Sequence, residues 1–524
     1  MASPMLRLAA LFAAAQGQQN GPRSLGYELR FVDTEAHPLA VCNDGSPAAY
    51  YYYKGSSDAW IVHQQGGWWC WDKYSCQVRW DHFANHTTEK RTLMSTKDLQ
   101  NLTDAFDTFN GEHNTGLMAH APTNPMANAS KVFLVYCSSD SHAGNRSMGS
   151  DGAGESKWHF RGKEIVAAVL AELRSEGLDD ASHFLLTGGS AGGMATINNG
   201  DWVADLVRAA APGARYLAMP DSGFFLDVQP GAMCQSPDSY ECKCAAGSAA
   251  SAPDGFNAGD GHAWLGRGQT LAQQMQAMHV YTNGAPDASC AAFYGRWGAW
   301  RCFLGQYAGP HLTAPTLFLQ NQIDEWQGFW NGFFDYATDA DAFEYMAWFR
   351  EESARTLGAA AGDDVYVFSP NCYHHGLAYD DIFWQVTVDE WTSASMMEAL
   401  LFGGAPPPRL VLDDCAGQPC SPKTRGHDDC LPVAPPSSPR THYGDPRDGC
   451  LWDEVRLEAA CAPRCGADGA CPRDVPPGST ATPACAITDG AGVKLCALEC
   501  ASGDCPAGAS CDRVAGAGIC TYAE

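Results

Sequence analysis

The stretch HFLLTGGSAGG, residues 183–193, constrains the fold of this chain more than any other. An apolar run ends at Leu186, glycines stand on both sides of Ser190, and a helical pattern follows. Gly-X-Ser-X-Gly between a buried strand and a helix is typical of a sharp turn that strains the serine and presents its hydroxyl above the sheet. A plain glycine-rich turn is the alternative in a chain with 54 glycines, but the flanking strand and helix favour the first interpretation.

Short apolar runs of strand length recur along the chain, at residues 59–63, 132–136, 183–186, 216–219, 316–320 and 365–368. Between the second and third runs, apolar residues repeat at spacings of three and four, which marks one face of a helix. They are Ile165, Val166, Val169, Leu170 and Leu173. After Ser190, a looser helical pattern is interrupted at residues 198–200. Strands that alternate with helices predict an α/β fold with a mostly parallel sheet covered on both faces.

A reactive serine needs a base, and the base needs an orienting carboxylate. Reactive residues of parallel sheets gather at the carboxyl ends of strands. The run 316–320 leads into Asp324, and the run 365–368 leads into His374 and His375. The order Ser, Asp, His along the chain is that of α/β-hydrolases. Spacing does not separate the two histidines, and Asp221, after the run 216–219, is a second candidate acid.

The stretch IVHQQGGWWCWDKYSC, residues 61–76, follows another strand and precedes Ser190. In hydrolases with the chain order Ser, Asp, His, a loop that follows an earlier strand donates backbone N–H groups to the oxyanion hole. The residue after the serine donates another. Gly66 and Gly67 suit this because a side chain would block the substrate oxygen. Cys70 and Cys76 are close enough to bridge a small loop. Taken alone, the stretch suits an ordinary disulfide loop equally well.

The cysteines divide the chain into two parts. Ten precede residue 400 and thirteen lie between Cys415 and Cys520. A Pro/Ser/Gly-rich interval at 432–449 separates the first three of these thirteen from the rest. This predicts a large domain over 18–425, a linker over 426–449 and a disulfide-stapled module over 450–524. Zinc is the rival for the module, but the tail's histidines, His427 and His442, lie outside the dense cluster. The total of 23 is odd, so one thiol is free or pairs between chains.

The N-terminus and the composition predict a secreted protein. Residues 1–17 carry Arg7, a short Leu/Ala/Phe run and small residues, as signal peptides do. Cysteine density fits an oxidising compartment, and four Asn-X-Ser/Thr sequons offer glycosylation sites at Asn85, Asn101, Asn128 and Asn145. A net charge of −27 argues against nucleic acid as a partner. No apolar run after the N-terminus is long enough for a transmembrane helix.

Several long motifs, in order, resemble the pectin acetylesterase/Notum family of secreted carboxylesterases, from about Val41 to Cys420. They are AVCNDGSPAAYYY, GGWWCWDKYSC, KRTLMSTK, VYCSSD, LLTGGSAGG, PDSGFF, QNQIDEWQ, NCYHH and DDCAGQPC. The GGWWC form, with VYCSSD and LMSTK, is closer to the Notum branch than to the plant enzymes, which usually read GGGWC. The cysteine-rich module beyond residue 430 departs from both branches, which leaves the natural substrate open.

The resemblance implies an α/β-hydrolase-like fold and a set of site residues. It makes Ser190 the nucleophile, Asp324 the orienting acid and His375, three residues after a cysteine, the base in preference to His374. It implies backbone donors of the oxyanion hole at Gly67, Trp68 and Ala191. It implies disulfides Cys70–Cys76 and Cys42–Cys137, and a structural role for Asp221. No metal is expected, since neither His374-His375 nor Cys242-X-Cys244 has a suitably spaced third ligand, and no cofactor is implied.

The implied function is hydrolysis of an O-acyl ester on an extracellular glycan or lipidated protein, of the palmitoleoyl-protein carboxylesterase type. A pectin-type O-acetylesterase is one alternative, and an inactive hydrolase fold that serves as a binding or matrix protein is another. The acyl pocket would decide between the first two. Trp69 and Trp71, with Trp68, are candidate walls of that pocket, or else a carbohydrate-stacking surface or core.

Overall fold

The computed structural model describes the chain in two compact units. The described residues are 26–85, 93–99, 116–147, 158–228, 270–330, 340–372, 374–378, 382–413, 450–453, 458–461, 471, 480–488, 494–500, 505, 509–514 and 517–523. The predicted signal peptide (1–17), the predicted linker (426–449), the sequon at Asn101 and the Cys242-X-Cys244 pair lie outside these ranges.

The larger unit contains a nine-stranded sheet of order β1-β2-β4-β3-β5-β6-β7-β8-β9. From β4 to β9 all neighbours are parallel, and β1 and β2 add an antiparallel edge. The strands are β1 (Glu28–Phe31), β2 (Ala49–Tyr53), β3 (Ala59–Gln64), β4 (Ser130–Leu134), β5 (His183–Gly189), β6 (Arg215–Asp221), β7 (Thr316–Leu319), β8 (Val365–Ser369) and β9 (Leu410–Leu412). This confirms the predicted mostly parallel sheet. The six predicted runs correspond to β3 to β8, whereas β1, β2 and β9 were not predicted.

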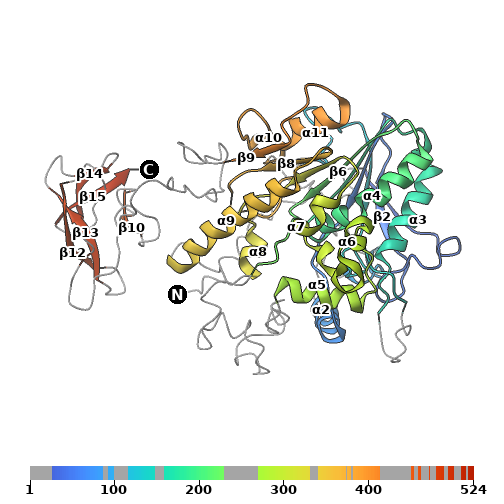
Figure 1. The fold of residues 1–524 in the computed structure, drawn as a ribbon, viewed down its shortest axis with the longest axis horizontal. Coiled ribbons are helices and arrows are strands. Elements are labelled where there is room, and N and C mark those ends of the chain that lie inside the picture. The colour runs from blue at the N-terminus through green and yellow to red at the C-terminus, as the bar shows by residue number, and fades with distance from the viewer. Residues whose placement is uncertain are drawn as a thin grey trace. The chain divides into compact units, whose positions relative to one another are not determined.

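Figure 1 shows the helices of the larger unit packed around this sheet. They are α2 (Lys73–Asn85), α3 (Gly162–Arg174), α4 (Ala191–Ala210), α5 (Leu271–Tyr281), α6 (Ala288–Gly298), α7 (Gly305–Ala308), α8 (Glu325–Trp330), α9 (Ala340–Ala360, of which residues 350–360 belong to this unit), α10 (Ile382–Gln385) and α11 (Ser393–Phe402). No helix in the described ranges combines the length and the apolar character needed to cross a bilayer.

Both faces of the sheet are apolar because successive strand residues point to opposite sides. In β5, Phe184 and Leu186 pack in a cluster with Val169 of α3 and Val203 of α4, while Leu185 packs in another cluster with residues of α11. The predicted apolar face of α3 is buried along its length. Helix α4 continues through residues 198–200, where a break in the pattern was expected. Those residues are polar or glycine yet buried, and the Asn199 side chain donates to Oε1 of Gln64 at 3.1 Å.

The smaller unit contains six antiparallel strands and a small apolar core. The strands are β10 (Cys450–Asp453), β11 (Glu458–Cys461), β12 (Thr482–Thr488), β13 (Lys494–Glu499), β14 (Ala509–Val514) and β15 (Ala517–Ala523). The core cluster comprises only Ala481, Leu498 and Cys520, with three further cysteines packed against it. Disulfides Cys500–Cys511 and Cys505–Cys520 staple this unit, which confirms the predicted disulfide-rich module.

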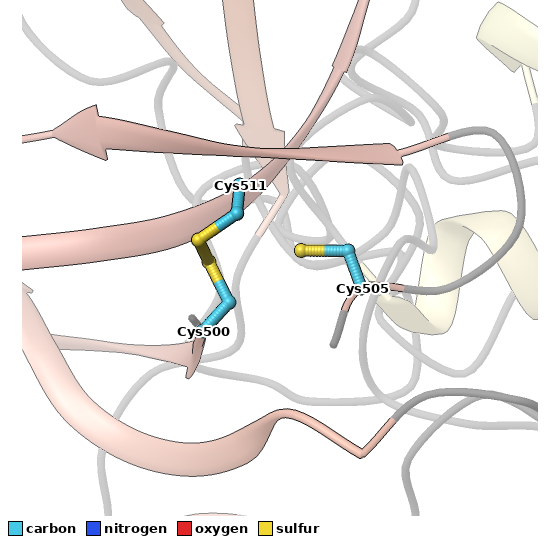
Figure 2. A group of neighbouring side chains, drawn as sticks. All are labelled: Cys500, Cys505 and Cys511. Carbon is cyan, nitrogen blue, oxygen red and sulfur yellow. A yellow bond between two sulfur atoms is a disulfide. The ribbon is translucent and has the colours of Figure 1, made fainter. Parts of the chain in front are cut away.

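The sulfur atoms of Cys500, Cys505 and Cys511 lie within 4.8 Å of one another, the sole such group of potential metal ligands in the described ranges. Figure 2 shows the disulfide between Cys500 and Cys511, with Cys505 beside it. The thiolate is the form of cysteine that ligates metals, and all three sulfurs here are in disulfides. Their proximity therefore reflects two adjacent bridges.

Candidate active site

Ser190 occupies a strained turn between β5 and α4. Its backbone has φ 58° and ψ −122°, a conformation that non-glycine residues rarely adopt. The turn is held by the Ser190 N–H, which donates to the Asp221 carbonyl at 2.9 Å. A Cβ at Gly192 would lie 1.9 Å from the Gln64 carbonyl oxygen, so only glycine permits this close crossing of strand and helix. The predicted strand–turn–helix is confirmed in detail.

Asp324 and His375 meet at the carboxyl end of the sheet. The Nδ1 atom of His375 lies 2.8 Å from Oδ2 of Asp324, which is 2% exposed. The other Asp324 oxygen accepts the Gln327 N–H at 2.8 Å, and Oδ2 also accepts from Gln320 at 3.1 Å. Because Asp324 Oδ2 accepts from the ring, Nδ1 of His375 is the donor and Nε2 is left as the acceptor nitrogen.

The surroundings of His375 raise the pKa of its imidazole. Burial lowers the pKa of His375, but the charge and hydrogen bond of Asp324, with the charges of Asp221 and Glu325, outweigh burial and raise the pKa above its ordinary value. The Nε2 atom is buried and makes no hydrogen bond within the described part of the chain. The side chain is 19% exposed. A ring with one nitrogen fixed by a carboxylate and the other unengaged is suited to general-base work.

Asp221, the second candidate acid, has a different environment. It is 1% exposed, and its carboxylate accepts the N–H groups of Leu377 at 2.9 Å and Ala378 at 2.9 Å. Its neighbour Ser222 accepts the Gly376 N–H at 2.8 Å and donates to Asp221 at 3.1 Å. Burial raises the pKa of Asp221 to about 6, against the effect of these hydrogen bonds. Asp221 and Ser222 therefore anchor the backbone that follows His375.

The glycine loop after β3 lies against Ser190. A Cβ at Gly66 would be 2.3 Å from the Gly189 carbonyl oxygen and 3.0 Å from Ser190 Cβ. Gly67 and Trp68 both have positive φ, 127° and 65°. The N–H groups of Gly67 and Ala191 donate no hydrogen bond to another described residue. Two successive residues with positive φ and two available backbone donors beside Ser190 are the geometry of an anion-binding backbone site.

Disulfides hold this region together. The bridges Cys70–Cys76 and Cys42–Cys137 are both formed, as the family resemblance implied. A third bridge, Cys290–Cys302, was not predicted. Cys372, which stands three residues before His375, is also in a disulfide.

Aromatic side chains surround His375, and we call Trp68, Trp69, Phe225 and Trp326 the aromatic wall. The rings of Trp326 and Phe225 lie 6.0 Å and 6.4 Å from the imidazole and 5.0 Å from each other. Trp68 and Trp69 lie 6.0 Å and 5.4 Å from the Trp326 ring. Sequence reasoning missed Phe225 and Trp326, although each stands within two to four residues of a candidate acid in the motifs PDSGFF and QNQIDEWQ.

The three tryptophans of the glycine loop differ in exposure. Trp69 and Trp71 are each 2% exposed and belong to the apolar cluster under the loop. Trp68 is partly exposed. Substrate contact by Trp69 and Trp71 stays a prediction, and their burial favours the core alternative.

Two of the sequons present exposed asparagines, at Asn128 and Asn145. Asn85 ends helix α2. Glycosylation at any of the four positions stays a prediction.

Comparison with known proteins places this site in a family. The family model described as Pectinacetylesterase matches residues 22–401. Palmitoleoyl-protein carboxylesterase NOTUM of Homo sapiens is 29% identical over 339 residues, which are 64% of this chain and 58% of the relative. Pectin acetylesterase 7 of Arabidopsis thaliana is 28% identical over 307 residues, which are 57% of this chain and 63% of the relative. This chain thus spans less than two thirds of the length of either relative.

A solved structure of the Wnt deacylase Notum from Drosophila shares the fold. The TM-score is 0.56 with 25% sequence identity, over 71% of this chain and 92% of that chain. This confirms the α/β-hydrolase-like fold class. Because the family model covers well over half of the chain, including the turn at Ser190 and the Asp324–His375 pair, the chain belongs to the pectinacetylesterase family.

Proposed function

We propose that this protein is a serine carboxylesterase in which Ser190, His375 and Asp324 form the catalytic triad. The observation that carries the proposal is the 2.8 Å contact of His375 Nδ1 with Asp324, at the same edge of the sheet as the strained Ser190. The contact to Asp324 also supports His375 rather than His374 as the base, and the anchoring contacts of Asp221 support Asp324 as the acid.

The chemistry is acyl transfer in two steps. The Ser190 hydroxyl attacks the ester carbonyl carbon while Nε2 of His375 takes its proton. The oxyanion that forms accepts hydrogen bonds from the N–H groups of Gly67, Trp68 and Ala191. Collapse expels the alcohol, which receives the proton from Nε2 and leaves an acyl ester on Ser190. Water, deprotonated by the same nitrogen, then hydrolyses that ester and releases the acid.

We propose an O-acyl ester on an extracellular glycan or lipidated protein as the substrate, with the palmitoleoyl-protein type preferred. Relatives with that name support it, and so do Trp68 and Trp326, the two partly exposed members of the aromatic wall, whose rings suit contact with a hydrocarbon chain. Secretion is supported by the disulfides in both units. We propose that residues 1–17 are a signal peptide, 18–425 the esterase domain, 426–449 a linker and 450–524 the cysteine-rich module.

Hydrolysis of p-nitrophenyl esters from acetyl to long unsaturated acyl chains tests this function. Burial of each methylene contributes about 0.8 kcal/mol, or roughly fourfold in kcat/KM while the chain stays in contact with the wall. We expect kcat/KM to rise at least tenfold from acetyl to octanoyl. A sharp optimum at acetyl would favour the O-acetylesterase alternative, and no hydrolysis above the buffer rate by the folded protein would favour the inactive alternative.

The variant Trp326→Ala tests whether the aromatic wall contacts the acyl chain. We expect it to lower kcat/KM for octanoyl more than for acetyl, because the shorter chain loses less contact with the wall. The acetyl ester is the internal reference for any general damage to the site. Equal losses for both esters would exclude Trp326 from the acyl pocket.

The raised pKa of His375 predicts the acid limb of the pH profile. The base works only when neutral, so kcat/KM falls as the pH drops through the pKa of His375 in the free enzyme. Because Asp324 raises that pKa, we expect the midpoint above the ordinary histidine value of about 6.5. A profile of kcat/KM from pH 4 to 9 with a soluble ester measures it. A midpoint clearly below 6 would contradict the electrostatic account of the pair.

A further inference from the structure

The five residues Ser138 to His142, which follow β4 and Cys137, form a buried polar loop that the proposed mechanism leaves without a role. All five are 0% exposed. Ser139, Ser141 and His142 have φ values of 54°, 52° and 52°. Three left-handed non-glycine residues within four positions are rare, and strain of this kind persists where the surrounding structure fixes it, often at functional sites.

This loop makes three hydrogen bonds around the proposed oxyanion hole, two to residues that flank the glycines and one to Ala191. The Ser139 carbonyl accepts the Cys70 N–H at 3.0 Å, just beyond Trp68 and Trp69. His142 Nε2 lies 3.0 Å from the Gln65 carbonyl, just before Gly66. Because a carbonyl only accepts, Nε2 carries the proton, and burial lowers the pKa of His142 to about 4, which keeps the ring neutral. Both flanks of the glycine loop are therefore fixed from the same segment.

The third contact reaches the other side of the oxyanion hole. The Ser141 hydroxyl donates to the Ala191 carbonyl at 2.5 Å. Ala191 supplies the proposed donor that follows the nucleophile, so this hydrogen bond fixes the backbone of the donor residue.

The loop is itself held rigid. Tyr136 Oη accepts the Ser141 N–H at 2.7 Å, and Arg79 Nε donates to the Ser139 hydroxyl at 2.9 Å. Asp140 accepts from Ser138 at 2.6 Å and from the Gly162 N–H at 2.9 Å. These buried hydrogen bonds restrict the loop and the groups that it carries to one arrangement.

We propose that residues 138–142 are a positioning loop that sets the separation of the two halves of the oxyanion hole, with Ser141 as its link to Ala191. The inference rests on the proposed esterase function. The loop is fully buried and acts through the backbone that it bonds, so these are positioning residues. Fixed donors are worth most in the transition state, when the carbonyl oxygen becomes an anion. Loss of the link therefore lowers kcat and leaves KM nearly unchanged.

The test compares Ser141→Gly, Ser141→Ala and wild type. Glycine removes the hydroxyl but accepts a φ of 52° without strain, so this variant folds even if the alanine variant does not. We expect kcat for a short p-nitrophenyl ester to fall about ten- to hundredfold, by analogy with displaced or deleted oxyanion donors. We expect KM within about twofold, an unchanged acid limb of the pH profile, and an equal fall in affinity for a trifluoromethyl ketone, which forms a tetrahedral adduct. Ser175→Ala, at an exposed position, is the control.

The outcomes separate this inference from the proposed function. If wild type hydrolyses the ester through Ser190 but Ser141→Gly keeps its kcat and its affinity for the ketone, the positioning role is wrong and the esterase proposal stands. A lower thermal midpoint with unchanged kcat would show a structural role only, and would also overturn the inference. If wild type itself has no hydrolysis that depends on Ser190, both proposals fail.

Discussion

Replacement of Ser190 by alanine lowers kcat for ester hydrolysis by about 10⁵- to 10⁶-fold, because it removes the hydroxyl on which the acyl intermediate of the proposed mechanism forms. Removal of the nucleophile from a serine hydrolase costs roughly this much, and the residual rate comes from binding and the oxyanion hole. Ser190 is partly exposed and its hydroxyl caps no backbone group of α4. We therefore expect the thermal midpoint to change little.

The measurement is kcat and KM with a short p-nitrophenyl ester, on variant and wild type purified in the same way. Ser175→Ala is again the control, because Ser175 is exposed and bonds only a carbonyl of its own helix. Equal rates for Ser190→Ala and wild type would show that the hydrolysis does not pass through Ser190. That result would favour the alternative of an inactive hydrolase fold.

Asp324→Asn lowers kcat by about 10⁴-fold while the fold stays intact. An amide in place of the carboxylate presents an N–H to His375 Nδ1, which stabilises the tautomer with its proton on Nε2, so the ring no longer accepts the Ser190 proton. The variant also loses the main group that raises the pKa of His375. We therefore expect the residual activity to have its acid limb at lower pH than wild type, which the same pH series measures.

Asp221→Asn is the matched comparison, because Asp221 is the other buried acid near His375. Its carboxylate holds the N–H groups of Leu377 and Ala378. Its loss therefore acts on stability and on loop order, and we expect a smaller fall in kcat than for Asp324→Asn together with a larger drop in the thermal midpoint. If Asp221→Asn costs more activity than Asp324→Asn, the assignment of the triad acid is wrong.

Local patterns predicted the elements that carry the candidate site. The central strands β3 to β8 are buried on both faces, so they read as continuous apolar runs, and the turn at Ser190 has a glycine pattern that its close crossing requires. The edge strands were missed for physical reasons. Strand β2 has the sequence AYYYY, without clear periodicity, and β9 has three residues.

Contacts between distant segments could not be predicted from spacing. Phe225 and Trp326 lie more than a hundred residues apart in the chain, yet their rings lie 5.0 Å from each other beside His375. The buried loop at Ser138–His142 contains five polar side chains in a row, a pattern typical of a surface turn. Its partners are Gln65, which follows β3, Cys70 of the disulfide loop and Ala191 of α4, so only the assembled fold reveals its place.

The most direct test of the account is identification of the residue that a fluorophosphonate probe labels in the purified, full-length protein. The probe reacts with an activated serine hydroxyl, and peptide mass spectrometry locates the adduct. We predict one adduct, on Ser190, which forms rapidly in wild type, more than a hundredfold more slowly in His375→Ala, and not at all in Ser190→Ala. An adduct on another residue, or labelling of Ser190 at an equal rate without His375, would contradict the central claim that His375 activates Ser190.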